Sequence, residues 1–167
     1  MNYAFRPAAP ADLPMLRRWL QTPEVVRWWG NPKIEARLLA EDMEDAGMVM
    51  LIVSLDGRPF AYVQHYDVGT WPQAHLAHLP NGARGMDAFI GEPALIGRGH
   101  GSAFLRLLAE RLMGEGATLV AVDPAADNGR AQRAYAKAGF VGEAVNLTEE
   151  GPVVVMTFSG ASQSAPR

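Results

Sequence analysis

The stretch Ile96-Gly97-Arg98-Gly99-His100-Gly101-Ser102 has a glycine at every second position and joins a predicted strand to a predicted helix. The strand is the mostly apolar segment Gly85–Ile90, and the helix is indicated by apolar residues that recur at helical spacing from Phe104 to Leu112. A glycine-rich loop in this place can aim several backbone N–H groups at an anion, and the helix dipole favours negative charge there. The loop lacks the spacing of dinucleotide-binding folds and of the nucleotide P-loop. An alternative is a tight turn between strand and helix that binds nothing.

The elements on either side of this loop predict a mixed sheet. A first strand, Tyr3–Arg6, is followed by amphipathic helices at Ala11–Leu20 and from Pro32 to Gly47, and later by Asn128–Ala138. The remaining strands are expected at Met48–Leu55, Phe60–Tyr66, Thr118–Val122, Val141–Val145 and Val153–Phe158. This order is neither a repeat of βαβ units nor all-β, so we expect an α+β fold with a central sheet of about six to seven strands flanked by about four helices.

Two turns and one long loop complete the predicted organisation. Asp56-Gly57 is a strong hairpin signal between two of the strands. The irregular segment Asp67–Arg84 is long for a compact domain, which is typical of functional or mobile loops. We expect a single domain over residues 1–158, followed by a flexible tail at 159–167.

Composition excludes several classes of function. With 167 residues and no cysteine, the chain has no disulfide, no thiolate metal site and no cysteine nucleophile. A net charge of -3 with scattered basic residues argues against nucleic-acid binding. No apolar run could span a membrane and no secretory signal is present, so we expect a cytoplasmic protein without a membrane partner. His75 and His78 would share a helical face, but nearby prolines and the lack of a locally spaced carboxylate indicate no metal site.

The segment Ile96–Gly101 resembles the Gln/Arg-x-x-Gly-x-Gly/Ala signature that GNAT acetyltransferases use to hold the pyrophosphate of CoA, with Ile96 in place of the first polar residue. Downstream, Asp123–Ala131 and Tyr135–Phe140 resemble the second CoA-contacting block of that family, with its Asn-x-x-Ala and Tyr-x-x-x-Gly-Phe spacing. Together with Trp28-Trp29-Gly30 and Arg84–Phe89, the set is similar to the aminoglycoside 6'-N-acetyltransferases. The resemblance covers roughly residues 15 to 158.

This resemblance implies a GNAT fold and direct transfer of acetyl from acetyl-CoA to a primary amine, without an acyl-enzyme and without a metal. It implies a cofactor site formed by Phe89, Ile90, Gly97, Arg98, Gly99, His100, Gly101, Ser102, Asn128, Ala131 and Tyr135. Tyr135 would protonate or position the CoA sulfur, and Asn128 would hydrogen-bond the pantetheine arm. The alternatives are a core tyrosine and a plain helix N-cap.

Asp87 is the candidate catalytic base because it interrupts an apolar strand just before the loop, where a carboxylate could accept the proton of an amine. The alternative is an aspartate at the strand edge that pairs with Arg84. Asp123 could hold a cationic acceptor or simply start an Asp-Pro turn. Trp28 and Trp29 could form a wall of the acceptor site, although core packing of at least one is expected.

The acceptor implied by the resemblance is the 6'-amine of aminoglycoside antibiotics. The loop Trp71–Pro80 lacks the acidic cluster of the resembled resistance enzymes, so two alternatives stay open. One is acylation of a siderophore precursor, a protein N-terminus or another small amine. The other is a CoA-binding module without turnover. We expect a monomer or homodimer.

Overall fold

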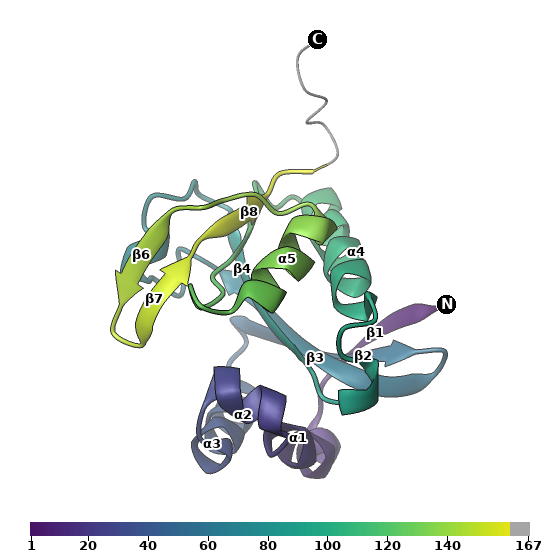
Figure 1. Cartoon of the computed structure of the whole chain (residues 1–167). Helices are drawn as coiled ribbons and strands as arrows, with labels where there is room; N and C mark the ends of the chain where they lie inside the picture. Colours follow the sequence, from purple (N-terminus) through teal and green to yellow (C-terminus); the bar gives the residue numbers. More distant parts are fainter. Residues whose placement is uncertain (161–167) are drawn as a thin grey trace. The chain divides into compact units, whose positions relative to one another are not determined.

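The structure is a computed structural model and describes residues 1–160. Its α-helices are α1 (Leu13–Leu20), α2 (Pro23–Trp29), α3 (Pro32–Asp42), α4 (His100–Gly114) and α5 (Gly129–Ala138) (Figure 1). Its strands are β1 (Tyr3–Pro7), β2 (Met48–Leu55), β3 (Arg58–Asp67), β4 (Arg84–Ile90), β5 (Val120–Val122), β6 (Val145–Thr148), β7 (Gly151–Val154) and β8 (Met156–Phe158). Short 3₁₀ turns lie at Pro10–Asp12, Ala74–Leu76 and Pro93–Leu95. Of the tail predicted at 159–167, residues 161–167 lie outside the described residues.

Six of the strands form one mixed sheet in the order β1-β2-β3-β4-β5-β8, and β6 pairs with β7 in a separate two-stranded sheet. β1 runs antiparallel to β2 with Tyr3 opposite Leu55, and β5 runs antiparallel to β8. β4 and β5 are parallel, and their paired register covers Arg84 opposite Val120 and Gly85 opposite Ala121. The predicted α+β class with a mixed sheet is confirmed.

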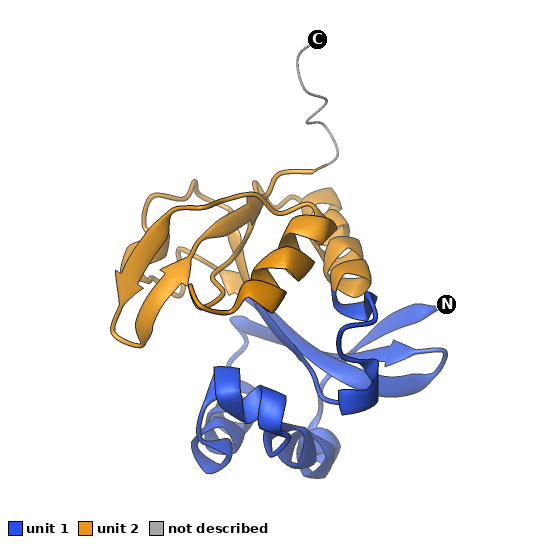
Figure 2. Cartoon of the chain, viewed as in Figure 1, with its two compact units in different colours: residues 1–65, 87–101 blue, residues 66–86, 102–167 orange. Residues whose placement is uncertain are grey.

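The chain divides into two compact units, which Figure 2 colours separately. Unit 1 contains residues 1–65 and 87–101, and unit 2 contains, of the described residues, 66–86 and 102–160. The boundary falls within β3 and β4, so each unit takes part of these two strands. The single domain expected over residues 1–158 stays a prediction.

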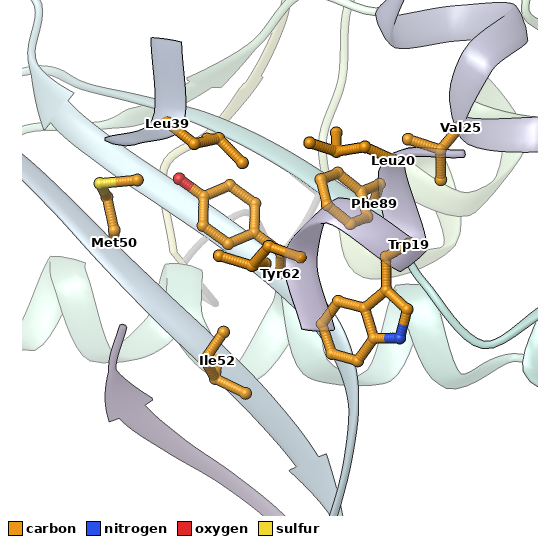
Figure 3. Close-up of a cluster of buried hydrophobic side chains, with 9 residues drawn as sticks. Trp19, Leu20, Val25, Leu39, Met50, Ile52, Tyr62 and Phe89 are labelled. Carbon is orange, nitrogen blue, oxygen red and sulfur yellow. The ribbon is translucent and has the colours of Figure 1, made fainter. Parts of the chain in front are cut away.

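The core of unit 1 explains why three helices gather on its strands. Apolar side chains of α1, α2 and α3 pack with side chains of β2, β3 and β4 in one cluster (Figure 3). The cluster consists of Leu16, Trp19, Leu20, Val25, Leu39, Met50, Ile52, Tyr62 and Phe89. The predicted hairpin between β2 and β3 is confirmed, and positive φ angles of 48° at Asp56 and 83° at Gly57 are those of a type I′ turn.

Helix α2 is the element of unit 1 that we did not predict. It has only 7 residues, with Pro23 in its first turn, and it ends at Gly30, where φ is 104°. Val25 is its one buried residue, so its apolar periodicity is too short to recognise in the sequence. α3 is clearer, because Pro32 opens it and the Asn31 side chain accepts hydrogen bonds from the first free backbone N–H groups.

Unit 2 has a smaller apolar cluster of Val68, Leu76, Ala83 and Val155. Helix α5 begins at an Asn128 cap and ends at Gly139, which has a φ of 108° and the left-handed conformation common after helices. This helix was predicted almost to the residue.

The predicted strand Val141–Val145 is wrong, and so is a single strand over Val153–Phe158. Val141 makes only an isolated bridge to Thr157, and the pairing residues lie further on, in β6. Gly142 lies against the backbone of Val155, where a Cβ would collide. The misleading feature was apolar composition, since Val141 and Val145 are exposed.

Within residues 1–160 we find no helix that combines the length and the apolar character needed to cross a bilayer.

Candidate active site

The glycine loop of unit 1 has the backbone conformation that anion binding needs. Gly97 and Gly99 have φ angles of 76° and 85°, which a residue with a side chain adopts only at a cost. The loop leads directly into the 15-residue helix α4, whose first N–H groups have no partner within the helix. These features fit a diphosphate group, held by backbone amides at the positive end of the helix dipole.

Two side chains of the predicted cofactor site are turned into the protein. His100 is 8% exposed, and its Nδ1 lies 2.7 Å from the hydroxyl oxygen of Tyr3, with the ring edge-on to Phe60. Ser102 is 6% exposed. Because these two side chains are buried, only the backbone of His100 and Ser102 is left to contact a ligand. The side chain of Arg98, by contrast, is exposed.

Asp87 lies on β4 of unit 1 and is only partly buried. Its Oδ2 accepts a hydrogen bond of 3.0 Å from Nε2 of Gln64 on β3. Gln64 was not predicted as a site residue, although its position two residues after Tyr62 in an apolar strand marks a polar side chain on one face.

The two tryptophans predicted for the acceptor site, Trp28 and Trp29, are both half-buried and differ in their contacts. Trp29 lies edge-on to Tyr62 and Phe89, so its packing against the core confirms that expectation for one of the two tryptophans. Phe89 is itself buried, so only its backbone could meet a cofactor. Trp28 donates a hydrogen bond of 3.1 Å to Glu24 and carries the guanidinium of Arg27 4.7 Å from its ring centroid.

Unit 2 contains the second candidate carboxylate, Asp123, which follows β5. Its Oδ2 lies 2.7 Å from Nε2 of His75, and the two side chains are 21% and 10% exposed. Burial raises the pKa of Asp123, and the hydrogen bond and charge of His75 act in the opposite direction. Sequence spacing could not reveal this pair, because His75 comes from the long loop before β4.

The remaining predicted cofactor residues of unit 2 lie at the N-cap of α5 and on this helix. The side chain of Asn128 caps the helix by accepting a hydrogen bond of 3.1 Å from the Ala131 N–H. Tyr135 is 9% exposed and edge-on to Phe140, with ring centroids 5.6 Å apart. The alternatives of a helix cap and a largely buried tyrosine thus describe part of what these residues do, and their contacts with CoA stay predictions.

Among residues 1–160, no group of three or more His, Cys, Asp or Glu side chains is arranged to hold a metal ion. His75, in the short turn Ala74–Leu76, contacts the single carboxylate of Asp123. The residues proposed for the chemistry supply a carboxylate, a phenol and backbone groups.

The family model of the acetyltransferase (GNAT) domain matches residues 8–145 of this chain. The chain belongs to the GNAT acetyltransferase family. Aminoglycoside N(6')-acetyltransferase type 1 of Klebsiella pneumoniae is 30% identical over 158 residues, which cover 87% of this chain and 77% of that protein.

The crystal structure of aminoglycoside acetyltransferase AAC(6')-Ib in complex with coenzyme A and kanamycin is also similar. Its TM-score is 0.82 at 29% sequence identity, and the match covers 95% of each chain. A more distant relative is N-hydroxyputrescine acetyltransferase of Acinetobacter baumannii, 28% identical over 127 residues that cover 68% of this chain and 61% of that protein. The predicted family and GNAT fold are confirmed.

Proposed function

We propose that this chain transfers the acetyl group of acetyl-CoA to the 6'-amine of aminoglycosides, by direct attack of the amine on the thioester. The observation that carries the proposal is the succession in unit 1 of Asp87 on β4 and the glycine loop with positive φ angles at the start of α4. Relatives whose names give this activity support the choice of acceptor. The proposal places the protein in the cytoplasm, because it needs a supply of acetyl-CoA.

The glycine loop holds the donor in this proposal. Backbone N–H groups from Gly97 to Ser102 bind the pyrophosphate, and the exposed Arg98 side chain adds positive charge. The backbone of Phe89 and Ile90 binds the pantetheine arm in this proposal, and the family resemblance assigns Asn128 and Ala131 to the same cofactor.

Acetyl transfer then needs one base and one acid. Asp87 takes a proton from the acceptor's ammonium, and the neutral nitrogen attacks the carbonyl carbon of the thioester. A C–N bond forms and the C–S bond breaks, while the second nitrogen proton leaves to solvent and Asp87 returns the first proton to solvent. Tyr135 donates its phenolic proton to the departing thiolate and is reprotonated from solvent. No cysteine or other covalent intermediate takes part.

The acceptor is a polycation, so fixed carboxylates support its binding. Asp87 on β4 is the proposed carboxylate of unit 1. Asp123 is the proposed carboxylate of unit 2. Trp28 is the proposed aromatic wall, through stacking and cation–π attraction to a sugar amine.

The donor half is tested by thermal denaturation with and without CoA. A ligand that binds only the folded state raises the melting temperature. We expect a rise with millimolar CoA, and an unchanged melting curve would contradict the assignment. Tyr135→Phe should lower kcat more than it changes the acceptor KM, because it removes only a proton donor.

The acceptor half is tested with Asp87→Asn. Turnover of kanamycin should fall by about two to four orders of magnitude, typical of losing a general base, while CoA binding stays intact. Glu149→Gln, which neutralises an exposed carboxylate between β6 and β7, is the matched control and should leave turnover unchanged. Wild-type turnover in Asp87→Asn would exclude the role.

A second candidate function is acetylation of an N-hydroxylated diamine. It is favoured by the N-hydroxyputrescine acetyltransferase among the relatives and by the absence of acidic residues from Trp71–Pro80. Mass spectrometry of kanamycin and of N-hydroxyputrescine, each incubated with acetyl-CoA, separates the two. Acetylation of kanamycin, with a 6'-hydroxyl analogue a poor substrate, would support the first candidate.

A further inference from the structure

Three side chains in unit 1 form a continuous line of hydrogen bonds that ends on Asp87. The hydroxyl of Tyr62 donates to Oε1 of Gln64 at 2.7 Å. The Nε2 group of the same amide donates to Oδ2 of Asp87 at 3.0 Å. Tyr62 and Gln64 lie two residues apart on β3, so their side chains leave the same face of that strand.

The chemistry of the three groups fixes the direction of both bonds. An ionised carboxylate only accepts hydrogen bonds, so the amide must turn its NH₂ toward Asp87. Its oxygen then faces Tyr62, which must donate. Tyr62 is suited to this, because burial and the charges of Asp87 and Asp42 raise its pKa and keep the phenol protonated.

The packing around Tyr62 fixes where its hydroxyl can be. Tyr62 is 0% exposed, its ring stacks on Phe89 with centroids 5.3 Å apart, and Trp29 lies edge-on at 6.1 Å. A ring held on two sides cannot swing away, so the phenol oxygen is a fixed point of the core. The hydrogen bond from this fixed hydroxyl orients the amide of Gln64, and the amide in turn orients the carboxylate of Asp87.

We propose that Gln64 is a positioning residue for Asp87 in acetyl transfer, and that Tyr62 acts on Asp87 only through Gln64. The inference rests on the role of Asp87 given under Proposed function. Gln64 orients the carboxylate toward the acceptor amine and stabilises its ionised form, since a hydrogen bond donated to a carboxylate favours the charged state. Preorganisation of this kind acts on the chemical step and leaves donor binding unaffected.

The test is a set of steady-state measurements across pH with kanamycin and acetyl-CoA. Gln64→Leu keeps the side-chain size but removes the donor. We expect kcat/KM for kanamycin to fall about 10- to 100-fold, as for a misaligned catalytic group. The acid limb of its pH profile should move to higher pH, while KM for acetyl-CoA stays unchanged. Gln73→Leu, which removes the hydrogen bond of 2.9 Å from Gln73 to Tyr66, is the matched control and should leave the acid limb in place.

Tyr62→Phe completes a double-variant cycle with Gln64→Leu. Alone, it should lower kcat/KM by a smaller factor, because the amide loses its fixed partner. In the Gln64→Leu background it should have no further effect on kcat/KM, since two residues that act through one contact are not additive. The double variant should also melt above Gln64→Leu, because Phe removes a buried hydroxyl that has lost its acceptor.

The outcomes separate this inference from the proposed function. If Asp87→Asn is inactive and Gln64→Leu shifts the acid limb, the inference is supported. If Asp87→Asn is inactive but Gln64→Leu keeps the wild-type pH profile, or the two variants add in kcat/KM, Gln64 is merely structural and the inference is overturned. If Asp87→Asn is fully active, the proposed role of Asp87 fails and the inference falls with it.

Discussion

Replacing Gly97 with alanine should weaken CoA binding through the backbone alone. A Cβ built on Gly97 has no atom within 4 Å, so the substitution causes no collision. The loss of stability comes from the backbone, because φ of Gly97 is 76°, a conformation that costs a residue with a side chain about 1–2 kcal/mol. For a protein of this size each kcal/mol lowers the melting temperature by about 2–4 °C, so we expect a drop of about 2–8 °C.

The same strain should act on the ligand. If the backbone relieves it by rotating, the neighbouring N–H groups turn away from the pyrophosphate. Losing one hydrogen bond to a charged group costs about 1.5–3 kcal/mol, which corresponds to a CoA dissociation constant raised about 10- to 150-fold. Isothermal titration of CoA measures this value.

Gly116→Ala is the matched control. Gly116 has a φ of 108° and open space around a built Cβ, and it follows α4 outside the glycine loop. We expect a similar loss of melting temperature with unchanged CoA affinity. Equal CoA affinity in Gly97→Ala and the wild type, with equal destabilisation in both variants, would refute the reasoning and place the pyrophosphate elsewhere.

Three further predictions concern stability and the acceptor. Gly91→Ala places a methyl group against the buried indole of Trp19, so overpacking should lower the free energy of unfolding by about 1–3 kcal/mol. An unchanged melting temperature would show that the indole ring moves aside without cost. Asp12→Asn should lower the free energy of unfolding, measured in urea at neutral pH, by about 1 kcal/mol, because the hydrogen bond from Arg6 holds the pKa of Asp12 below its usual value. That stability is present above the unfolded pKa of about 3.9 and is lost as pH falls through the lower folded value, so the difference between the two proteins should vanish in acid. The KM for kanamycin should rise with salt concentration and rise further in Asp123→Asn, while CoA affinity stays constant. A KM that changes neither with salt nor with the substitution would exclude electrostatic binding of the acceptor by Asp123.

Local signals in the sequence determined much of the framework. The Asp56-Gly57 turn, the Asn128 cap and the loop from Gly97 to Gly101 each depend on backbone preferences of one or two residues, and all three appear where they were predicted. The resemblance to the GNAT family also depends on short segments, among them Ile96–Gly101 and Tyr135–Phe140, and the family match confirms it. Such features need no knowledge of which segments meet in space.

Local signals failed where the outcome depends on packing. Val141 and Val145 have the composition of a buried strand, yet both are exposed and the pairing shifts to β6. Trp29 packs edge-on against Tyr62 and Phe89, which come from two different strands, and the sequence did not show which of the two tryptophans would pack in this way. Burial is a property of the neighbours that a side chain meets, and composition alone does not specify them.

The partners of the two candidate carboxylates were decided only by the tertiary structure. Asp87 could be recognised from its place in an apolar strand, but its hydrogen bond from Gln64 depends on how β3 and β4 lie together in the sheet. Asp123 could be recognised beside a proline, but His75 reaches it from a loop far away in the sequence. Alternation along a strand tells which face a side chain occupies, whereas the register between strands and the path of a loop decide what it touches there, and those are set by the burial of the whole core.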